Sequence, residues 1–205
     1  SSIGLSDIDM DINFDGSLTI HAINNTKHQA KAGGGAGSLL AAVGVGQAEI
    51  NTQTDTQVNI QDANITAGSI DAQSLSSNNN FVDLVTGSVG LAISGAGVIA
   101  KTSDKSKSKS ILSGSFTLSG RLADSSGPSG IFRVNTQHTA TFDHKVLVFS
   151  GGMLAGTGAD INHDINVDTL SVVSEDSSVV ANDIGITSRT DINKNLQSGR
   201  NLDGY

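Results

Sequence analysis

Alternation of apolar and polar positions is the strongest pattern along this chain. In "DIDMDINFDG" (7–16), apolar residues take every second position, acids or amides lie between them, and Gly16 ends the run. The same period of two recurs in "AEINTQTDTQVNI" (48–60) and "DINHDINVD" (160–168). A period of two places alternate side chains on opposite faces of a strand, so these segments are predicted to be half-buried β-strands. Helical spacing of apolar residues is almost absent.

Three blocks of small residues divide the chain into loose repeats. They are "AGGGAGSLLAAVGVG" (32–46), "TGSVGLAISGAGVIA" (86–100) and "SGGMLAGTGADIN" (150–162), and each block leads into the next polar segment. Matching Ser38 with Ser88 and Ser88 with Ser150 gives offsets of 50 and 62 residues. Imperfect repeats of about 50 to 60 residues indicate stacked supersecondary units.

These repeats predict a single elongated domain. The expected boundaries are approximately 16–67, 68–129 and 130–186 for the repeats and 187–205 for a terminal segment.

The predicted fold is all-β: a β-solenoid, similar to a parallel β-helix, of stacked short strands. Coils in such a stack lie about 4.8 Å apart. With roughly 20 residues per coil, we expect about ten coils and a domain about 50 Å long. The alternative is an antiparallel β-sandwich. Sandwiches usually have aromatic packing and turns marked by Pro, whereas this chain has 3% aromatic residues and one Pro.

Charge and composition narrow the function classes. The net charge of −8 argues against nucleic acid and anionic membranes as main partners. Cysteine is absent, which excludes disulfides and thiolate metal sites and is typical of many exported bacterial proteins. The longest apolar run, 89–100, is too short for a membrane-spanning helix, which needs about 20 residues. The chain opens with Ser1 rather than Met, which indicates a processed chain or a fragment.

A calcium loop is the alternative interpretation of the first alternating segment. "DINFDGSLTIHA" (11–22) places acids or an amide at loop positions 1, 3 and 5 and Gly at 6, but position 12 is Ala22 rather than Glu. A strand that ends at a glycine turn is therefore favoured. No cofactor other than calcium is expected. The candidate calcium ligands are Asp7, Asp9, Asp11, Asn13 and Asp15.

A lysine stripe follows the second small-residue block. As an interaction site it would bind acidic glycans or a neighbouring acidic subunit. The favoured interpretation is a solvated loop or edge strand whose lysines block aggregation. The stripe consists of Lys101, Lys105, Lys107 and Lys109.

Histidines offer little catalytic pattern. No pair has the helical i, i+4 spacing that metal sites favour, and most are expected at the surface. His138 and His144 flank "TATFD" and are the pair considered for a weak metal or acid–base role. The five positions are His21, His28, His138, His144 and His163.

An enzyme is expected only as a low-probability alternative, a polysaccharide-degrading β-helix. Three acids lie at even spacing and could therefore share one face of a strand: Asp160, Asp164 and Asp168. Next-but-one residues on one face lie about 7 Å apart, close to the carboxylate spacing of glycosidases. The chain has no Trp and one Tyr to stack on a sugar, so we predict that it is not an enzyme.

The segment that begins with the first small-residue block resembles the repeats of a known family. "AGGGAGSLLAAVGVGQAEINTQTDTQVNIQDANITAGSIDAQS" (32–74) is similar to repeats of large bacterial surface adhesins, the leukotoxin-type filamentous adhesins. Those repeats run as a Gly/Ala/Val block, a strand and an "ITAGSIDA"-like ending. Residues 86–124 and 150–186 match more loosely, and 1–15 and 187–205 hardly match.

The resemblance implies a secreted, elongated β-solenoid on the bacterial cell surface or outside the cell, and it implies no catalytic residues. We therefore expect a structural or interaction protein: a segment or subunit of a surface adhesin or extracellular filament. Its expected partners are further copies of itself, end to end or laterally, or neighbouring repeats of a longer chain, together with host or matrix glycans. A carbohydrate-active β-helix and a calcium-dependent binding module remain the alternatives.

Overall fold

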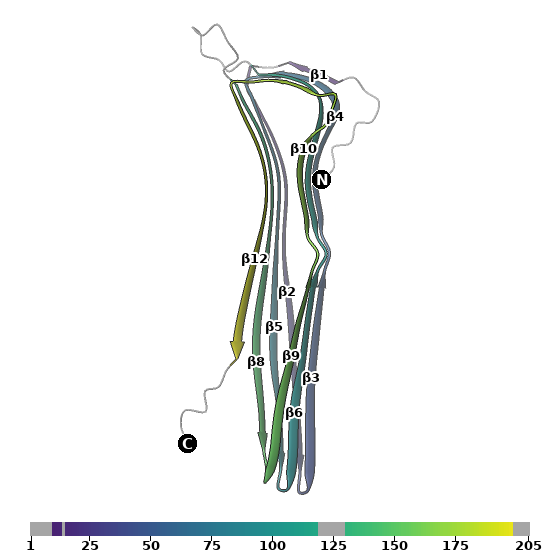
Figure 1. Ribbon diagram of the computed structural model, residues 1–205, viewed down its shortest axis with the longest axis vertical. Helices are drawn as coiled ribbons and strands as arrows, with labels where there is room; N and C mark the ends of the chain where they lie inside the picture. The colour runs from purple at the N-terminus through teal and green to yellow at the C-terminus, as the bar shows by residue number, and fades with distance from the viewer. Residues whose placement is uncertain (1–9, 14, 119–129, 199–205) are drawn as a thin grey trace.

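The computed structural model describes residues 10–13, 15–118 and 130–198 as a flattened stack of β-strands (Figure 1). The described residues contain no helix, and so none that could cross a membrane. The strands are β1 (Met10–Asn13), β2 (Ser17–Ser38), β3 (Ala41–Thr52), β4 (Asp55–Ala67), β5 (Ser69–Gly90), β6 (Ile93–Asp104), β7 (Lys107–Leu118), β8 (Ile131–Gly151), β9 (Leu154–Ile165), β10 (Asp168–Val173), β11 (Ser178–Val180) and β12 (Asp183–Ser198).

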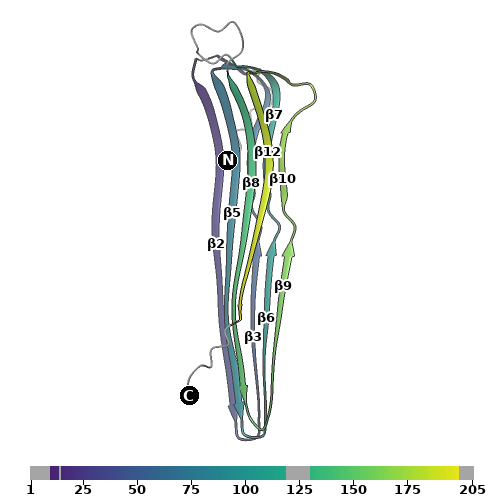
Figure 2. The same ribbon diagram turned by 60° about the vertical axis from the view of Figure 1, so that its left-hand side comes forward.

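Three parallel sheets form two walls. One wall is the sheet β2–β5–β8–β12; the other consists of β3–β6–β9 and, beyond it, β1–β4–β7–β10 with β11 also on β7. Figure 2 shows the chain running along one wall, turning at the narrow end and returning along the other. Every pair of neighbouring strands in the described chain is parallel. The predicted β-solenoid is therefore confirmed, and the antiparallel sandwich is wrong.

Each coil is much longer than expected. Ser17 pairs with Ser69, 52 residues later, and Ile131 pairs with Asp183 at the same offset. Between the second and third coils the offset is larger, because Ile70 pairs with Phe132. The expected coil of roughly 20 residues, and with it the stack of about ten coils, is wrong.

The small-residue blocks explain the difference in coil length. Each block holds one tight turn and continues as extended strand on both sides of it. β2 alone runs for 22 residues, about 70 Å at 3.3 Å per residue. The long axis of the molecule therefore follows the strands and not the stack. Matching Ser88 with Ser150 gives the observed register, whereas Ser38 pairs with Gly90, two positions away.

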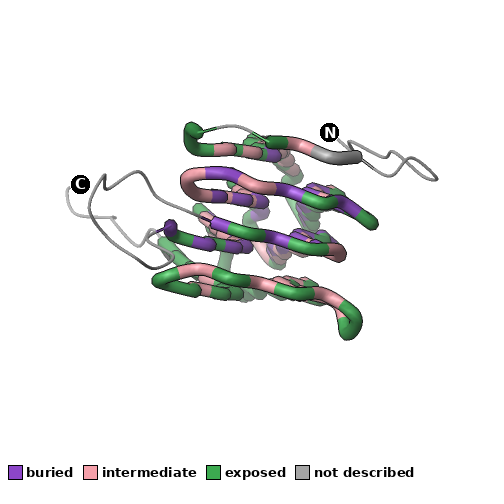
Figure 3. The backbone as a smooth tube through the Cα atoms, turned by 90° about the horizontal axis from the view of Figure 1, so that it is seen from above, coloured by how far each residue is buried: buried purple, intermediate pink, exposed green. Residues whose placement is uncertain are grey.

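Alternate side chains fill a thin interior that contains two apolar clusters. One cluster lies near the end where β4 leads into β5, and its Phe116 and Phe132 rings are 5.3 Å apart. The other includes Val82, Leu84 and Val98. Figure 3 shows that burial is greatest in the two central coils and falls in the outer coils. The inner coils are covered on both sides by neighbours, and the outer coils on one side only.

A bulge interrupts the ladder between β4 and β7. The register shifts between Ile60 and Ala63, and Asp62 in the bulge has a φ of 49°. Gly114 faces the bulge with a φ of 124°, and a Cβ built there would lie 2.1 Å from the Ala63 carbonyl oxygen. Both the backbone conformation and the space at position 114 therefore require glycine.

Gly114→Ala is predicted to lower the free energy of unfolding by about 1–3 kcal/mol, because alanine at this φ is strained and its Cβ collides with the β4 backbone. The matched control is Gly95→Ala. Gly95 lies in β6 with nothing within 4 Å of an added Cβ, so this change should be neutral or stabilising by up to about 1 kcal/mol. Urea denaturation of both variants measures the difference. Equal effects would contradict the strained bulge.

Candidate functional site

A stripe of buried polar side chains separates the two apolar clusters. Asn78 on β5, Asp104 at the end of β6, Ser106 in the following turn and His138 on β8 are fully buried. They share the interior because each occupies an inward position of the alternation. We call these four residues the polar seam. Burying a carboxylate in a protein interior is costly unless hydrogen bonds and an opposite charge compensate it.

The Asp104 carboxylate is the centre of the polar seam. The Asn78 Nδ2 donates to its two oxygens at 3.2 and 3.0 Å, and the Ser106 Oγ donates to Oδ1 at 2.5 Å. The His138 Nε2 lies 3.4 Å from Oδ2. From the first coil, Thr26 donates to the Asn78 Oδ1 at 2.6 Å. The network therefore joins three successive coils.

The hydrogen bonds decide the charge of Asp104. Burial raises the pKa of its carboxyl, but the nearby His138 ring and the hydrogen bonds from Ser106 and Asn78 together outweigh burial. The resulting pKa lies below the ordinary value, so the carboxylate is ionised at neutral pH. Stability that depends on this carboxylate is present above pH 4 and is lost as the pH falls through the lowered pKa.

A second buried group lies nearer the narrow end. The Thr102 Oγ1 lies 3.0 Å from the His144 Nε2 and 2.9 Å from the His163 Nδ1. The two imidazole rings stack with centroids 4.5 Å apart, and Phe142 meets the His163 ring edge-on. Burial, with a contribution from the His163 charge, lowers the pKa of His144 to about 4. The pKa of His163 is also lowered, by burial and by Lys194.

The expectation of surface histidines is wrong for His138 and His144, which are buried. The alternation of the strand could have predicted their burial, because both histidines occupy even-numbered positions, as the apolar Phe132 and Phe142 do. The polar seam is not open to a substrate, because Asp104 and His138 have no exposed surface. Among the described residues no three acidic or histidine side chains converge in a way that could hold a metal ion.

The lysine stripe lies on the outer face of the central coil. β6 and β7 each have a neighbour on both sides, so the edge-strand interpretation is wrong. Lys105 forms an ion pair with Asp164 at 3.5 Å, and Lys109 forms one with Asp168 at 3.0 Å. Lys107 lies in register between Asp168 and an acid of the first coil.

That acid is Asp55, which pairs with Lys107 across β4 and β7, as Glu49 pairs with Lys101 across β3 and β6. The solvent-facing side of the wall that contains β3–β6–β9 and β4–β7–β10, which we call the outer wall, is therefore acidic in the first coil, basic in the second and acidic in the third. The lysines are matched by carboxylates of their own chain. Exposed pairs of this kind contribute little stability, about 0–1 kcal/mol each.

The candidate calcium ligands are only partly described. Asp7 and Asp9 lie outside the described residues. Asp11 and Asn13 are in β1, which pairs with the end of β4, and Asp15 is exposed beside the turn into β2. The segment is thus a strand over 10–13, and calcium binding there stays a prediction.

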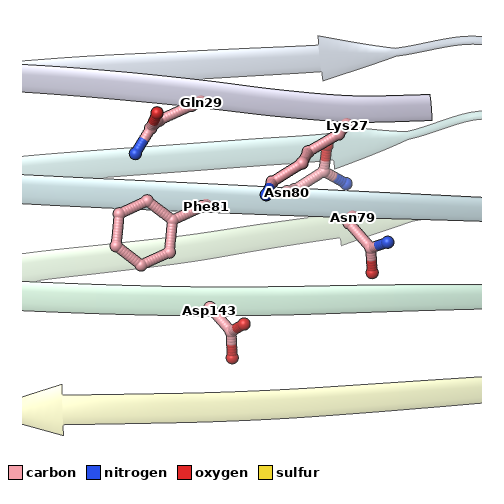
Figure 4. Close-up of a pocket in the computed structure, with 6 residues that line it drawn as sticks. All are labelled: Lys27, Gln29, Asn79, Asn80, Phe81 and Asp143. Carbon is pink, nitrogen blue, oxygen red and sulfur yellow. The ribbon is translucent and has the colours of Figure 1, made fainter.

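A shallow depression on the outer face of the β2–β5–β8 wall was not foreseen from the sequence. Figure 4 shows the Phe81 ring lying along β5, with polar side chains on either side and Asp143 on the neighbouring β8. Amides, charged groups and one phenyl face offer a flat polar ligand, such as a sugar ring, both stacking and hydrogen bonds. The lining residues are Lys27, Gln29, Asn79, Asn80, Phe81 and Asp143.

Comparison of the chain with protein-family models, with curated proteins and with solved structures finds no match. The resemblance to filamentous adhesins therefore stays a prediction.

His144→Gln is predicted to reduce the loss of stability in acid. The unfolded chain takes up a proton at this site below pH 6.5, whereas the folded protein keeps the imidazole neutral down to about pH 4. The free energy of unfolding should therefore fall as the pH drops from 6.5 to 4, by on the order of 3 kcal/mol from this group. Urea denaturation at pH 7, 5.5 and 4.5 measures the slope.

His21→Gln is the matched control for that experiment, because His21 lies on β2 and is exposed. Its pH dependence should follow that of the unchanged protein. Parallel slopes for His144→Gln and the unchanged protein would contradict a neutral buried imidazole.

Proposed function

We propose that this chain is a structural segment of a secreted bacterial β-solenoid, a surface adhesin or extracellular filament, whose coil stack continues beyond it on both sides. The observation that carries the proposal is the open edge at each end. Within the described chain, β2 and β3 pair on one side only, and so do β9 and β12. Open parallel edges are templates for further strands.

Side chains at the open ends support this proposal. Along one interior row, Ile70 is 1% exposed and Phe132 is 0% exposed, while Ile184 of the outer strand is 50% exposed. A further coil would cover Ile184 as β12 covers Phe132. Because apolar burial drives such stacking, the outer coils gain stability from neighbours.

The charge order of the outer wall indicates which neighbours fit. Within the chain, the lysine row of the second coil lies between two acidic rows. Asp55 in the first coil and Asp168 in the third both pair with Lys107, and directly opposed like charges are destabilising. Neighbouring strands with basic rows therefore fit beside the acidic rows of this wall.

The function of such a segment is mechanical and presentational. Parallel backbone ladders make a stiff stack, and the broad outer walls display surfaces such as the depression around Phe81 to host or matrix glycans. Of the three carboxylates considered for catalysis, Asp164 and Asp168 form ion pairs with lysines. No observation favours the enzyme or calcium alternatives over the structural one.

Inserting a duplicate of residues 69–182 after Asn182 tests the proposal. Ile184 and Ile70 both pair with Phe132, so the duplicate should continue the stack in register and keep the acid–base alternation. The expected product is a soluble monomer that is about 10 Å longer along the stack. Its urea m-value should be larger by roughly half, since m follows the surface buried. Small-angle scattering and urea denaturation measure both quantities.

The matched control duplicates residues 69–130 alone, inserted after Gly130. It places Lys107 opposite a second Lys107 and should be less stable than the two-coil insertion. The proposal is wrong if the two-coil insertion yields no gain in length and m-value, or if the extra coils unfold separately.

A further inference from the structure

The narrow end of the molecule, where each coil turns from one wall to the other, carries no charge. We call it the apolar tip and define it as residues 32–48, 84–100 and 146–159. None of these residues is Asp, Glu, Lys, Arg or His. Figures 1 and 2 show the three turns side by side at this end.

Large apolar side chains of the tip face solvent. At the turns Met153 is 87% exposed, Leu39 is 76% exposed, and Leu40 and Leu91 are also exposed. Val43 on β3 is 72% exposed, and Val89 on β5 is exposed on the other wall. Clustered exposure of this kind is rare on soluble proteins and marks a surface for interaction. The apolar surface surrounds the tip, so a partner with one flat face would leave part of it in water.

A collar of alternating charges bounds the tip. Lys31, Asp83 and Lys145 form one row across β2, β5 and β8. On the opposite wall Glu49 and Lys101 form a second row across β3 and β6. The mixed signs match a headgroup layer that carries both phosphate and ammonium groups, and they offer no excess of positive charge to an anionic surface.

Length and hydrogen bonding limit how deeply lipid could cover the tip. Lys31 lies eight residues before Leu39, about 25 Å of extended chain, which approaches the ~30 Å thickness of a hydrocarbon core. The strand edges of β2, β3 and β9 have no neighbour among the described strands, and unpaired backbone groups are excluded from hydrocarbon. Shallow contact through the turns, about 5–10 Å deep, satisfies both limits.

We propose that the apolar tip docks on a zwitterionic phospholipid surface by inserting its three turns among the lipid headgroups. The apolar side chains at the turns enter the boundary between headgroups and acyl chains, and the collar stays in the headgroup layer. The strands then stand upright on the membrane. This proposal does not depend on whether the coil stack continues.

Flotation with phosphatidylcholine vesicles tests the proposal. The unchanged chain is expected to float with the vesicles. The combined variant Leu40→Asp, Leu91→Asp and Met153→Asp should lower the partition coefficient at least tenfold. All three side chains are exposed, so the fold should be kept, as checked by circular dichroism and thermal melting.

The matched control adds the same three charges outside the tip, as Ile23→Asp, Asn51→Asp and Gln61→Asp. These positions are exposed, and the control should bind vesicles within twofold of the unchanged chain. Equal losses in both variants would show a general charge effect and would overturn the proposal, as would failure of the unchanged chain to float.

A fluorescence measurement keeps the test independent of the folding of the aspartate variants. The chain has no Trp, so Met153→Trp introduces a single reporter at the tip and Ile23→Trp one away from it. Vesicles should shift the emission of the first to the blue and leave the second unchanged. If neither shifts, and the aspartate variant instead abolishes self-association in sedimentation velocity without lipid, the tip is an interface between copies and the proposal is wrong.

Discussion

Parallel backbone pairing between successive coils is the constraint on which the rest of this structure depends. Once Ser17 lies beside Ser69, every side chain of β2 has its neighbour in β5 assigned. Because side chains alternate between faces, a slip of one residue would turn the apolar set of a whole strand outward. The rows that result, from Ile70 and Phe132 in the interior to Asp55 and Lys107 outside, are consequences of the pairing between successive coils.

The polar seam acts on the same register. Facing sheets lie about 10 Å apart, so the interior holds a single layer of side chains from each wall. An ionised carboxylate such as Asp104 is costly there unless its partners stand opposite it. Asn78 and Ser106 belong to the same coil as Asp104. His138 comes from the next coil and Thr26, which donates to Asn78, from the previous one, so these two contacts form only when the coils are stacked in the observed register. A slipped stacking register would therefore separate Asp104 from His138 and Asn78 from Thr26.

Local alternation was enough to predict extended strands over 48–60 and 160–168, but not the length of a coil. A period of two predicts which face of the strand a residue occupies. It does not predict where the chain turns from one wall to the other. The turns at 39–40 and 91–92 are built from Leu and Ala, residues that do not signal a turn, so the sequence did not show where a coil changes walls. The burial of His138 follows from its parity with Phe132. Its contact with Asp104 does not, because that contact requires the register between coils.

Because the coil is long, the open strand edges and the apolar tip face perpendicular directions. The open edges point along the stack, where further coils add, whereas the apolar tip points along the strands. A longer stack would therefore repeat the tip in a line, one turn for each coil, at the spacing of about 4.8 Å set by the backbone ladder. Contacts that are weak for one coil would then act together, since each bound turn holds its neighbours close to the same surface. A coil of some 20 residues would lack this geometry. Its turns would lie close to its interior and to the charged residues of its walls. The long coil thus places a charge-free end far from the interior that stabilises it.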